Sequence, residues 1–196
     1  DYATVTYEML IPNLSGAMAD LNLRKAIMYA IDYNTLISNV YLDMAQQCEV
    51  PIPPGSWLYE TQSAIYQYSP ERALQLLYDA GWAVQTEDNM LTKIENGVIK
   101  YLSIEISTDE DAASNVRGNA AEQIVENLRA IGIDASSTIL TKSEVSKKLK
   151  NENFDLALVA VNLSETPNLI PLLTSGGAVN YSGANSDSLR DLVAAT

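Results

Sequence analysis

The sequence FDLALVAV, residues 154–161, decides the fold that we predict for this chain. It is a continuous apolar run rich in strand-forming residues, which is typical of a strand covered on both faces in a parallel sheet. We therefore predict a central strand here. Its carboxyl end leads into residues 162–167, Asn-Leu-Ser-Glu-Thr-Pro. In open α/β sheets ligands bind beyond the carboxyl ends of the strands, so this segment is a candidate binding site; an ordinary loop is the alternative.

The second half of the chain, residues 98–196, alternates between strand and helix patterns. The elements that we predict are strands at 98–107, 133–140 and 154–161 and helices at 116–131 and 142–150. The first of these strands alternates apolar and polar residues, which indicates an edge or half-covered position. The order β-α-β-α-β predicts right-handed crossovers and parallel strands, and hence an α/β fold with helices on both faces of the sheet.

The first half, residues 1–97, is more helical and irregular. The predicted elements are a strand at 5–11, a helix with an apolar stripe from Leu23 to Ile31, a second helix with a stripe from Leu36 to Met44, a third at 69–81, and a hairpin strand at 90–94. Asn96-Gly97 between two apolar stretches predicts a tight hairpin turn. The proline-rich segment VPIPPGS at 50–56 predicts an extended surface crossing.

Composition and charge limit the classes of partner. The chain has 196 residues, of which 47% are apolar and 19% charged, enough for one domain with a sizeable core. Its formal net charge of -13 argues against nucleic acid or an anionic membrane surface as a partner. The sequence has no apolar run long enough to span a bilayer. Cys48 is the one cysteine, so no internal disulfide can form, and we expect it to be an apolar filler.

Common catalytic and cofactor motifs are absent. The chain has no histidine, which removes Ser-His-Asp and Cys-His arrangements and the commonest ligand of zinc and iron. No glycine-rich nucleotide motif occurs, so we predict no cofactor. Asp109-Glu110-Asp111 lacks the ligand spacing of a calcium loop and indicates a helix start rather than a metal site. Lys147, Lys148 and Lys150 suit the carboxyl end of a helix. We predict that the protein is not an enzyme.

Three stretches resemble the bacterial solute-binding proteins of the dipeptide, oligopeptide and nickel uptake family. They are LRKAIMYAIDYNTLI at 23–37, PIPPGS at 51–56 with SPERALQLLYDAGW at 69–82, and FDLALVAVN continuing into LLTSGGAVNYSGANSDSLRDLV within 154–193. They occur in the family's order and together span nearly the whole chain.

The resemblance implies the type II periplasmic-binding-protein fold, in which two α/β lobes close on a solute about a hinge. This chain is then the second, carboxyl-side lobe, with a mostly parallel sheet flanked by helices. We then expect a first lobe that is missing here, reached by segments before Tyr2 and after Thr196. The implied function is capture of a peptide or similar small solute and its delivery to a membrane ABC permease. The implied location is outside the cytoplasmic membrane, either periplasmic or anchored at the cell surface as a lipoprotein.

The resemblance also implies the site. Peptide binders of the family carry an Asp after the central strand that pairs with the peptide's amino group, and Asn162 stands at the matching position. An amide cannot neutralise an ammonium, and losing a charge-assisted bond costs on the order of 1.5–3 kcal/mol. Either Glu165 substitutes or the solute is not a peptide. The residues that we predict for the cleft are Asn162, Leu163, Ser164, Glu165, Asn180 and Tyr181. For Asn180 and Tyr181 the alternative is a loop that satisfies its own polar groups.

Two other classes of protein remain as alternatives. The same fold could serve as the ligand-sensing domain of a cytoplasmic transcriptional regulator, which a DNA-binding segment upstream would reveal. An enzyme would need activity that is lost on Glu165→Gln.

Overall fold

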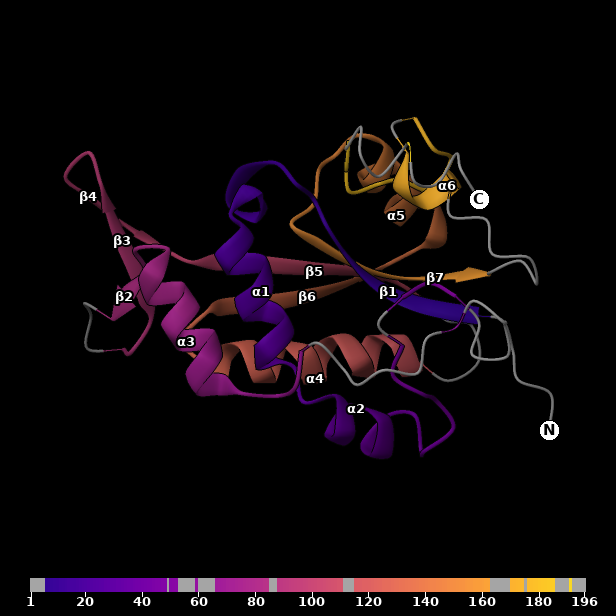
Figure 1. The fold of residues 1–196 in the computed structure, drawn as a ribbon, viewed down its shortest axis with the longest axis horizontal. Coiled ribbons are helices and arrows are strands. Elements are labelled where there is room, and N and C mark those ends of the chain that lie inside the picture. Colours follow the sequence, from indigo (N-terminus) through magenta and orange to yellow (C-terminus); the bar gives the residue numbers. More distant parts are fainter. Residues whose placement is uncertain are drawn as a thin grey trace.

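The computed structural model describes residues 6–48, 50–52, 59, 66–84, 88–110, 115–162, 170–174, 176–185 and 191. A four-stranded sheet runs through its centre in the order β1-β7-β5-β6 (Figure 1). Its strands are β1 (Thr6–Pro12), β5 (Ser103–Asp109), β6 (Asp134–Leu140) and β7 (Leu156–Asn162). β5 is parallel to β6 and β7, and β1 is antiparallel to β7. The mostly parallel α/β sheet and the interior position of the predicted central strand are confirmed.

Helices cover both faces of this sheet. α4 (Val116–Ala130) connects β5 to β6 and packs on one face, whereas α5 (Lys142–Lys150) connects β6 to β7 and packs on the other (Figure 1). The predicted β-α-β-α-β order is therefore confirmed. Because the chain leaves β5 toward β6 and then returns past β5 to β7, the direction of winding reverses between β5 and β7.

The larger core lies on the α4 face. It contains Leu102, which lies between β4 and β5, and Ile104 and Ile106 of β5. Apolar side chains of α4 and of two helices from the first half, α1 (Leu21–Ala30) and α3 (Pro70–Asp79), pack with them. A smaller cluster on the α5 face contains Ile11, Val145, Leu149, Phe154 and Ala157. The alternation of β5 thus divides its side chains between a buried apolar face and a more polar one.

Two expectations for β5 were wrong. β5 is not an edge strand, since it lies between β7 and β6. The predicted strand 98–107 is also two strands, because β4 (Val98–Tyr101) belongs to a separate small sheet with β3 (Leu91–Glu95) and β2 (Ala83–Val84). The change occurs at Leu102. Its N–H donates to the carbonyl of Leu91 in the small sheet at 2.9 Å, and its own carbonyl accepts from the N–H of Asp134, the first residue of β6, at 2.9 Å.

Capping side chains mark where the predicted helices begin. The carboxylate of Asp20 accepts from the first turn of α1, that of Asp32 from α2 (Tyr33–Asn39), and the hydroxyl of Ser69 from α3. Asn96 and Gly97 have φ of 53° and 77°, as the predicted tight hairpin turn requires. The remaining short helices are η1 (Gly16–Ala19) and α6 (Ile170–Leu173).

The second helix is shorter than its apolar pattern predicts. α2 ends at Asn39, and Leu42 and Asp43 then take left-handed backbone conformations with φ of 52° and 59°. The stripe predicted from Leu36 to Met44 is therefore wrong beyond the helix end, and Met44 is 82% exposed.

Candidate functional site

A pocket of about 280 Å³ lies at the carboxyl edge of the parallel strands, on the face that α5 covers. Side chains of β1, β7 and α5 form its walls, and Asp109 at the end of β5, Arg117 in the first turn of α4 and Tyr181 complete them. This is the edge at which open α/β sheets bind ligands, and it lies where the winding reverses between β5 and β7.

Strand register explains why a pocket forms there. β7 pairs with β1 as far as Thr6 opposite Asn162, whereas its pairing with β5 ends at Thr108 opposite Leu158. The last four residues of β7, 159–162, therefore extend beyond their β5 neighbour. Residues 159–161 line the pocket, so the pocket occupies the side that β5 leaves uncovered.

The wall on the α5 side is apolar. Val145 and Leu149 of α5 are buried, and Met9, Val159 and Tyr181 pack against the small cluster that contains them. A capping box positions this helix: the Thr141 hydroxyl accepts from the N–H of Glu144 at 3.3 Å, and the Glu144 carboxylate accepts from the N–H of Thr141 at 2.9 Å. The pocket therefore suits a solute with an aliphatic part.

The opposite rim carries a charged network centred on Arg117. Its guanidinium donates to Asp109 and, at 3.3 Å, to Oε1 of Glu8, and the hydroxyl of Tyr41 donates to Glu8. The Arg117 side chain is only 9% exposed. Burial acts to lower the pKa of Arg117, but the charges of Glu8 and Asp109 and the hydrogen bonds to them outweigh it and raise that pKa. Arg117 is therefore held as a cation.

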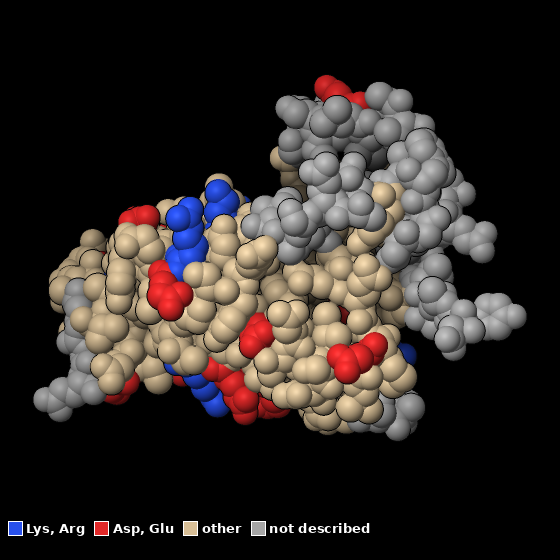
Figure 2. All heavy atoms as spheres, turned by 60° about the horizontal axis from the view of Figure 1, so that its bottom comes forward, with Lys and Arg blue, Asp and Glu red and all other residues tan. Residues whose placement is uncertain are grey.

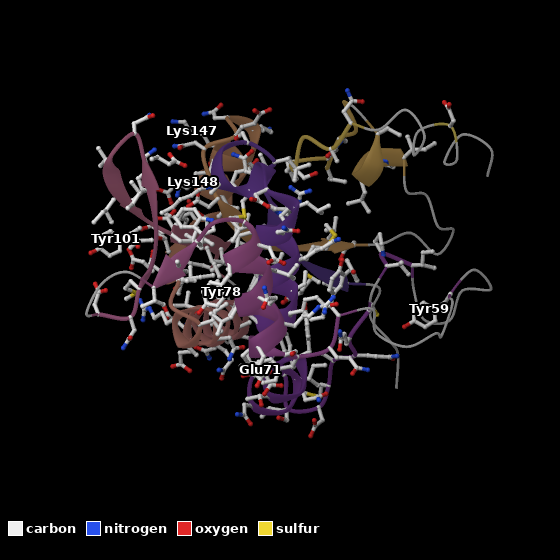
Figure 3. All side chains as sticks on the ribbon, turned by 60° about the vertical axis from the view of Figure 1, so that its left-hand side comes forward. Tyr59, Glu71, Tyr78, Tyr101, Lys147 and Lys148 are labelled. Atoms are coloured by element: carbon white, nitrogen blue, oxygen red, sulfur yellow. The ribbon has the colours of Figure 1, made fainter. Side chains whose placement is uncertain are left out.

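A second polar cluster lies further down the same face of the sheet. The carboxylate of Glu105 accepts from Lys148 and, at 3.1 Å each, from the hydroxyls of Ser107 and Thr138. The hydrogen bond from Lys148 is the largest cause that lowers the pKa of Glu105. Figure 3 places Lys148 on the sheet side of Lys147, so only part of the predicted lysine group points to solvent. Glu105 and Lys148 line a polar hollow of about 500 Å³ that also includes Asp155, just before β7, and thus lies at the amino ends of the strands.

The predicted site residues do not all meet at the pocket. Tyr181 lines it. Asn162 is exposed at the end of β7, where its side-chain Oδ1 accepts from the hydroxyl of Thr6 at 3.2 Å. The Asn180 amide serves its own loop, because Nδ2 donates to the carbonyls of Thr174 and Ala184 at 2.8 and 2.7 Å. Leu163, Ser164 and Glu165 lie outside the described residues.

Sequence reasoning missed Asp109 and Arg117 as residues of the pocket. Asp109 is the last residue of β5, and its carboxylate is paired with Arg117 instead of starting a solvated helix. The position of Arg117 could have indicated its role. A cation in the first turn of a helix opposes the helix dipole, so its presence there predicts a carboxylate partner nearby. Within the described ranges, no group of three or more His, Cys, Asp or Glu side chains could hold a metal ion.

No helix in the described part of the chain is long and apolar enough to cross a membrane.

Solved structures share this architecture. The oligopeptide-binding protein AppA of Bacillus subtilis in complex with a nonapeptide superposes with a TM-score of 0.87 at 24% identity, over 98% of this chain and 38% of that one. NikZ of Campylobacter jejuni in complex with Ni(L-His) gives a TM-score of 0.83 at 22% identity, over 97% of this chain and 38% of that one. The fold is that of a lobe of the type II periplasmic binding proteins, as predicted.

Sequence relatives agree with the fold. AppA of Bacillus subtilis (strain 168) is 27% identical over 180 residues, 87% of this chain and 32% of that protein. The dipeptide-binding protein of Escherichia coli (strain K12) is 36% identical over 62 residues, 32% of this chain and 12% of that protein. The chain thus spans about a third of AppA's length. The model of the bacterial extracellular solute-binding proteins, family 5 Middle, matches residues 1–181. This chain therefore belongs to family 5 of the bacterial extracellular solute-binding proteins.

Proposed function

We propose that this chain is the solute-binding lobe of an ABC importer's binding protein, and that the pocket at the carboxyl edge of its sheet is this lobe's share of the solute cleft. The pocket carries the proposal. It combines an apolar wall from α5 and β7 with charged groups at Asp109 and Arg117, the mixture that small-molecule sites use for affinity and orientation.

In this proposal a second lobe covers the pocket when solute binds, by rotation about a hinge. Closure removes the solute from water and strengthens its polar contacts, because hydrogen bonds and ion pairs gain strength as water is excluded. The protein then presents the loaded, closed form to a membrane permease outside the cytoplasmic membrane, in the periplasm or at the cell surface.

The proposed solute is a peptide or similar small molecule, and the lobe performs no chemistry on it. Proteins of known name to which the chain is similar bind oligopeptides, dipeptides and nickel-histidine. The surface is compatible with a small solute. On the face in Figure 2, acidic groups are scattered among uncharged side chains, and the basic groups of the described residues form no broad patch that would suit nucleic acid.

A binding test on the full-length protein checks this proposal. The probes are dipeptides, pentapeptides, a nonapeptide and nickel with histidine, and the readouts are thermal unfolding and calorimetry. A bound probe at 100 times its dissociation constant should raise the free energy of unfolding by about 2.7 kcal/mol and the melting temperature with it. If no probe of any class binds, the proposal is contradicted.

A variant pair locates the site. Tyr181→Ala should weaken binding at least about fivefold, since truncating an aromatic anchor costs on the order of 1 kcal/mol or more. The matched control is Tyr78→Ala on α3, where the tyrosine is 46% exposed and lies on the helix layer opposite α5 (Figure 3). Equal effects of the two substitutions would place the solute elsewhere.

A further inference from the structure

The two most exposed large apolar side chains among the described residues occur in one turn, just after α2. Met44 is 82% exposed and Leu42 is 68% exposed, and neither belongs to the hydrophobic clusters found between described residues. A single exposed apolar side chain is ordinary on a protein surface, but large apolar side chains that are exposed together mark interaction sites. Residues 41–44, which we call the apolar turn, are therefore a candidate interaction surface.

The backbone holds the apolar turn in a defined conformation. The N–H of Asp43 donates to the carbonyl of Ile37 at 3.1 Å, and the N–H of Met44 donates to the carbonyl of Tyr41 at 2.9 Å. Leu42 and Asp43 have φ of 52° and 59°, in the left-handed region that residues with a large side chain avoid. The turn thus keeps a fixed shape at a cost in free energy, and this shape presents Leu42 and Met44 outward.

The apolar turn lies at the edge of the sheet that carries the pocket. The hydroxyl of Tyr41 donates to Glu8, and the hydroxyl of Tyr7 donates to the carbonyl of Cys48 at 3.2 Å, so both ends of the segment 41–48 contact the first residues of β1. Because β1 is antiparallel to β7, its first residues lie at the carboxyl edge of the parallel strands. Figure 1 shows the chain that leaves α2 at the same end of the molecule as the tip of β7.

The second lobe of the proposed function is the partner that this position selects. It covers the pocket on closing, so it must approach the edge of the sheet beside which the apolar turn lies. Another exposed apolar pair, Ile94 and Ile99 of the β3–β4 hairpin, lies at the opposite end of the molecule, away from the pocket (Figure 1). Asp43 is the one charged residue of the apolar turn, so the contact that the turn offers is chiefly apolar.

We infer that the apolar turn is a docking surface for the second lobe, and that Leu42 and Met44 are buried against an apolar part of that lobe when the cleft closes. This inference rests on the proposed function. It adds a contact that stabilises the closed form without touching the solute, since neither side chain lines the pocket. Such a contact changes the closing equilibrium itself, so its effect on affinity is the same factor for every solute.

Oxidation of Met44 tests the inference on the wild-type, full-length protein. Dilute hydrogen peroxide converts accessible methionine to its sulfoxide, and peptide mass spectrometry gives the rate at each methionine. The solute is the tightest-binding probe among the dipeptides, pentapeptides, nonapeptide and nickel with histidine. At saturation it should slow the oxidation of Met44 at least fivefold. Met90, half-buried just before β3, is the internal control, and its rate should not change.

A double variant tests the contribution of the contact to affinity. Leu42→Asn removes the apolar side chain but keeps a residue type that tolerates the left-handed conformation, and it is combined with Met44→Ser. In the full-length protein this variant should weaken binding at least about tenfold, by one common factor for every probe that binds. The matched control, Ile94→Thr with Ile99→Thr, changes side chains that are 57% and 50% exposed, and it should leave binding within twofold of the wild type.

The outcomes separate this inference from the proposed function. Unchanged oxidation of Met44 on adding solute, or unchanged affinity in the double variant, overturns the inference while the proposed function stands, because solute binding is still observed. Factors that differ between probes would show that the apolar turn touches the solute, and lost transport with unchanged affinity would assign the turn to the permease; both overturn the inference. If the wild type binds no probe, the proposed function fails and the inference fails with it.

Discussion

Arg117 shows how this domain stabilises a largely buried charge. A cation in the first turn of α4 opposes the helix dipole, and burying an ion costs several kcal/mol unless partners compensate. Glu8 and Asp109 provide that compensation from two different strands. The sequence could not show this grouping, because Glu8 and Arg117 are 109 residues apart and only the β1–β7 pairing brings Glu8 to the end of β5.

Glu105 allows a test of how the stability of the fold depends on pH. Its pKa is lowered, chiefly by the hydrogen bond from Lys148, so the unfolded chain binds its proton more readily than the folded protein does. Its stabilising effect is therefore fully present above the ordinary glutamate value of about 4.3 and is lost as the pH falls through the lowered folded value. Glu105→Gln should cost stability at pH 7, and the difference from wild type should shrink toward pH 3.

Urea unfolding at a series of pH values measures this difference. The Glu105 side chain is 39% exposed, so solvent screening keeps the effect small. Glu110→Gln, at an exposed position, reports what removing one negative charge does to a chain with net charge -13. A difference for Glu105→Gln that is the same at pH 3 and pH 7 would show that the pairing with Lys148 does not stabilise the fold.

The elements that the sequence predicted well are those whose ends carry local signals. α5 begins at a capping box, and α4, which ends at Ala130, is followed two residues later by Gly132, whose φ of 85° suits glycine. A Cβ at Gly132 would lie 2.8 Å from the carbonyl oxygen of Asn89, so a side chain there would also clash with the small sheet's connection. Such signals depend on a few neighbouring residues, so distant parts of the chain do not change them.

The division between β4 and β5 has no such signal. Apolar and polar residues alternate from Leu102 to Ile106, and alternation reports which face a side chain takes but not which strand lies beside it. Pairing partners far along the chain decide that, with Leu91 on one side of Leu102 and Asp134 on the other. The misjudged edge position of β5 has the same origin, since polar contacts of Glu105 and Asp109 produce its alternation.

The side chain of Leu102 should therefore contribute strongly to the stability of the fold. The side chain is 1% exposed and lies in the larger core where the two sheets meet, so Leu102→Ala should lower the free energy of unfolding by about 2–5 kcal/mol. Ile99→Ala in β4 is the matched control, because Ile99 is 50% exposed and its truncation should cost less than about 1 kcal/mol. Denaturant unfolding measures both, and equal losses would contradict the role given to Leu102.

For this protein the fold is more predictable from the sequence than the binding site. The rule that ligands bind at the carboxyl edge directs attention to the edge where the pocket lies, because that rule depends only on strand direction. The members of the pocket come from β1, β5, β7, α4, α5 and the segment with Tyr181. Which side chains converge there depends on strand overhang and helix placement, and a loop such as that of Asn180 can look like a site while it bonds to itself.

The pocket of a single lobe should bind poorly by itself. Well-formed sites bury 70–90% of a ligand's surface, and one wall of a cleft cannot do so. We expect the isolated 196-residue chain to bind any probe that the full-length protein binds at least about 100-fold more weakly. Calorimetry on both proteins measures the ratio, and near-UV circular dichroism verifies that the isolated chain is folded. Equal affinities would show that this lobe encloses its solute alone and that closure of a second lobe adds nothing to binding.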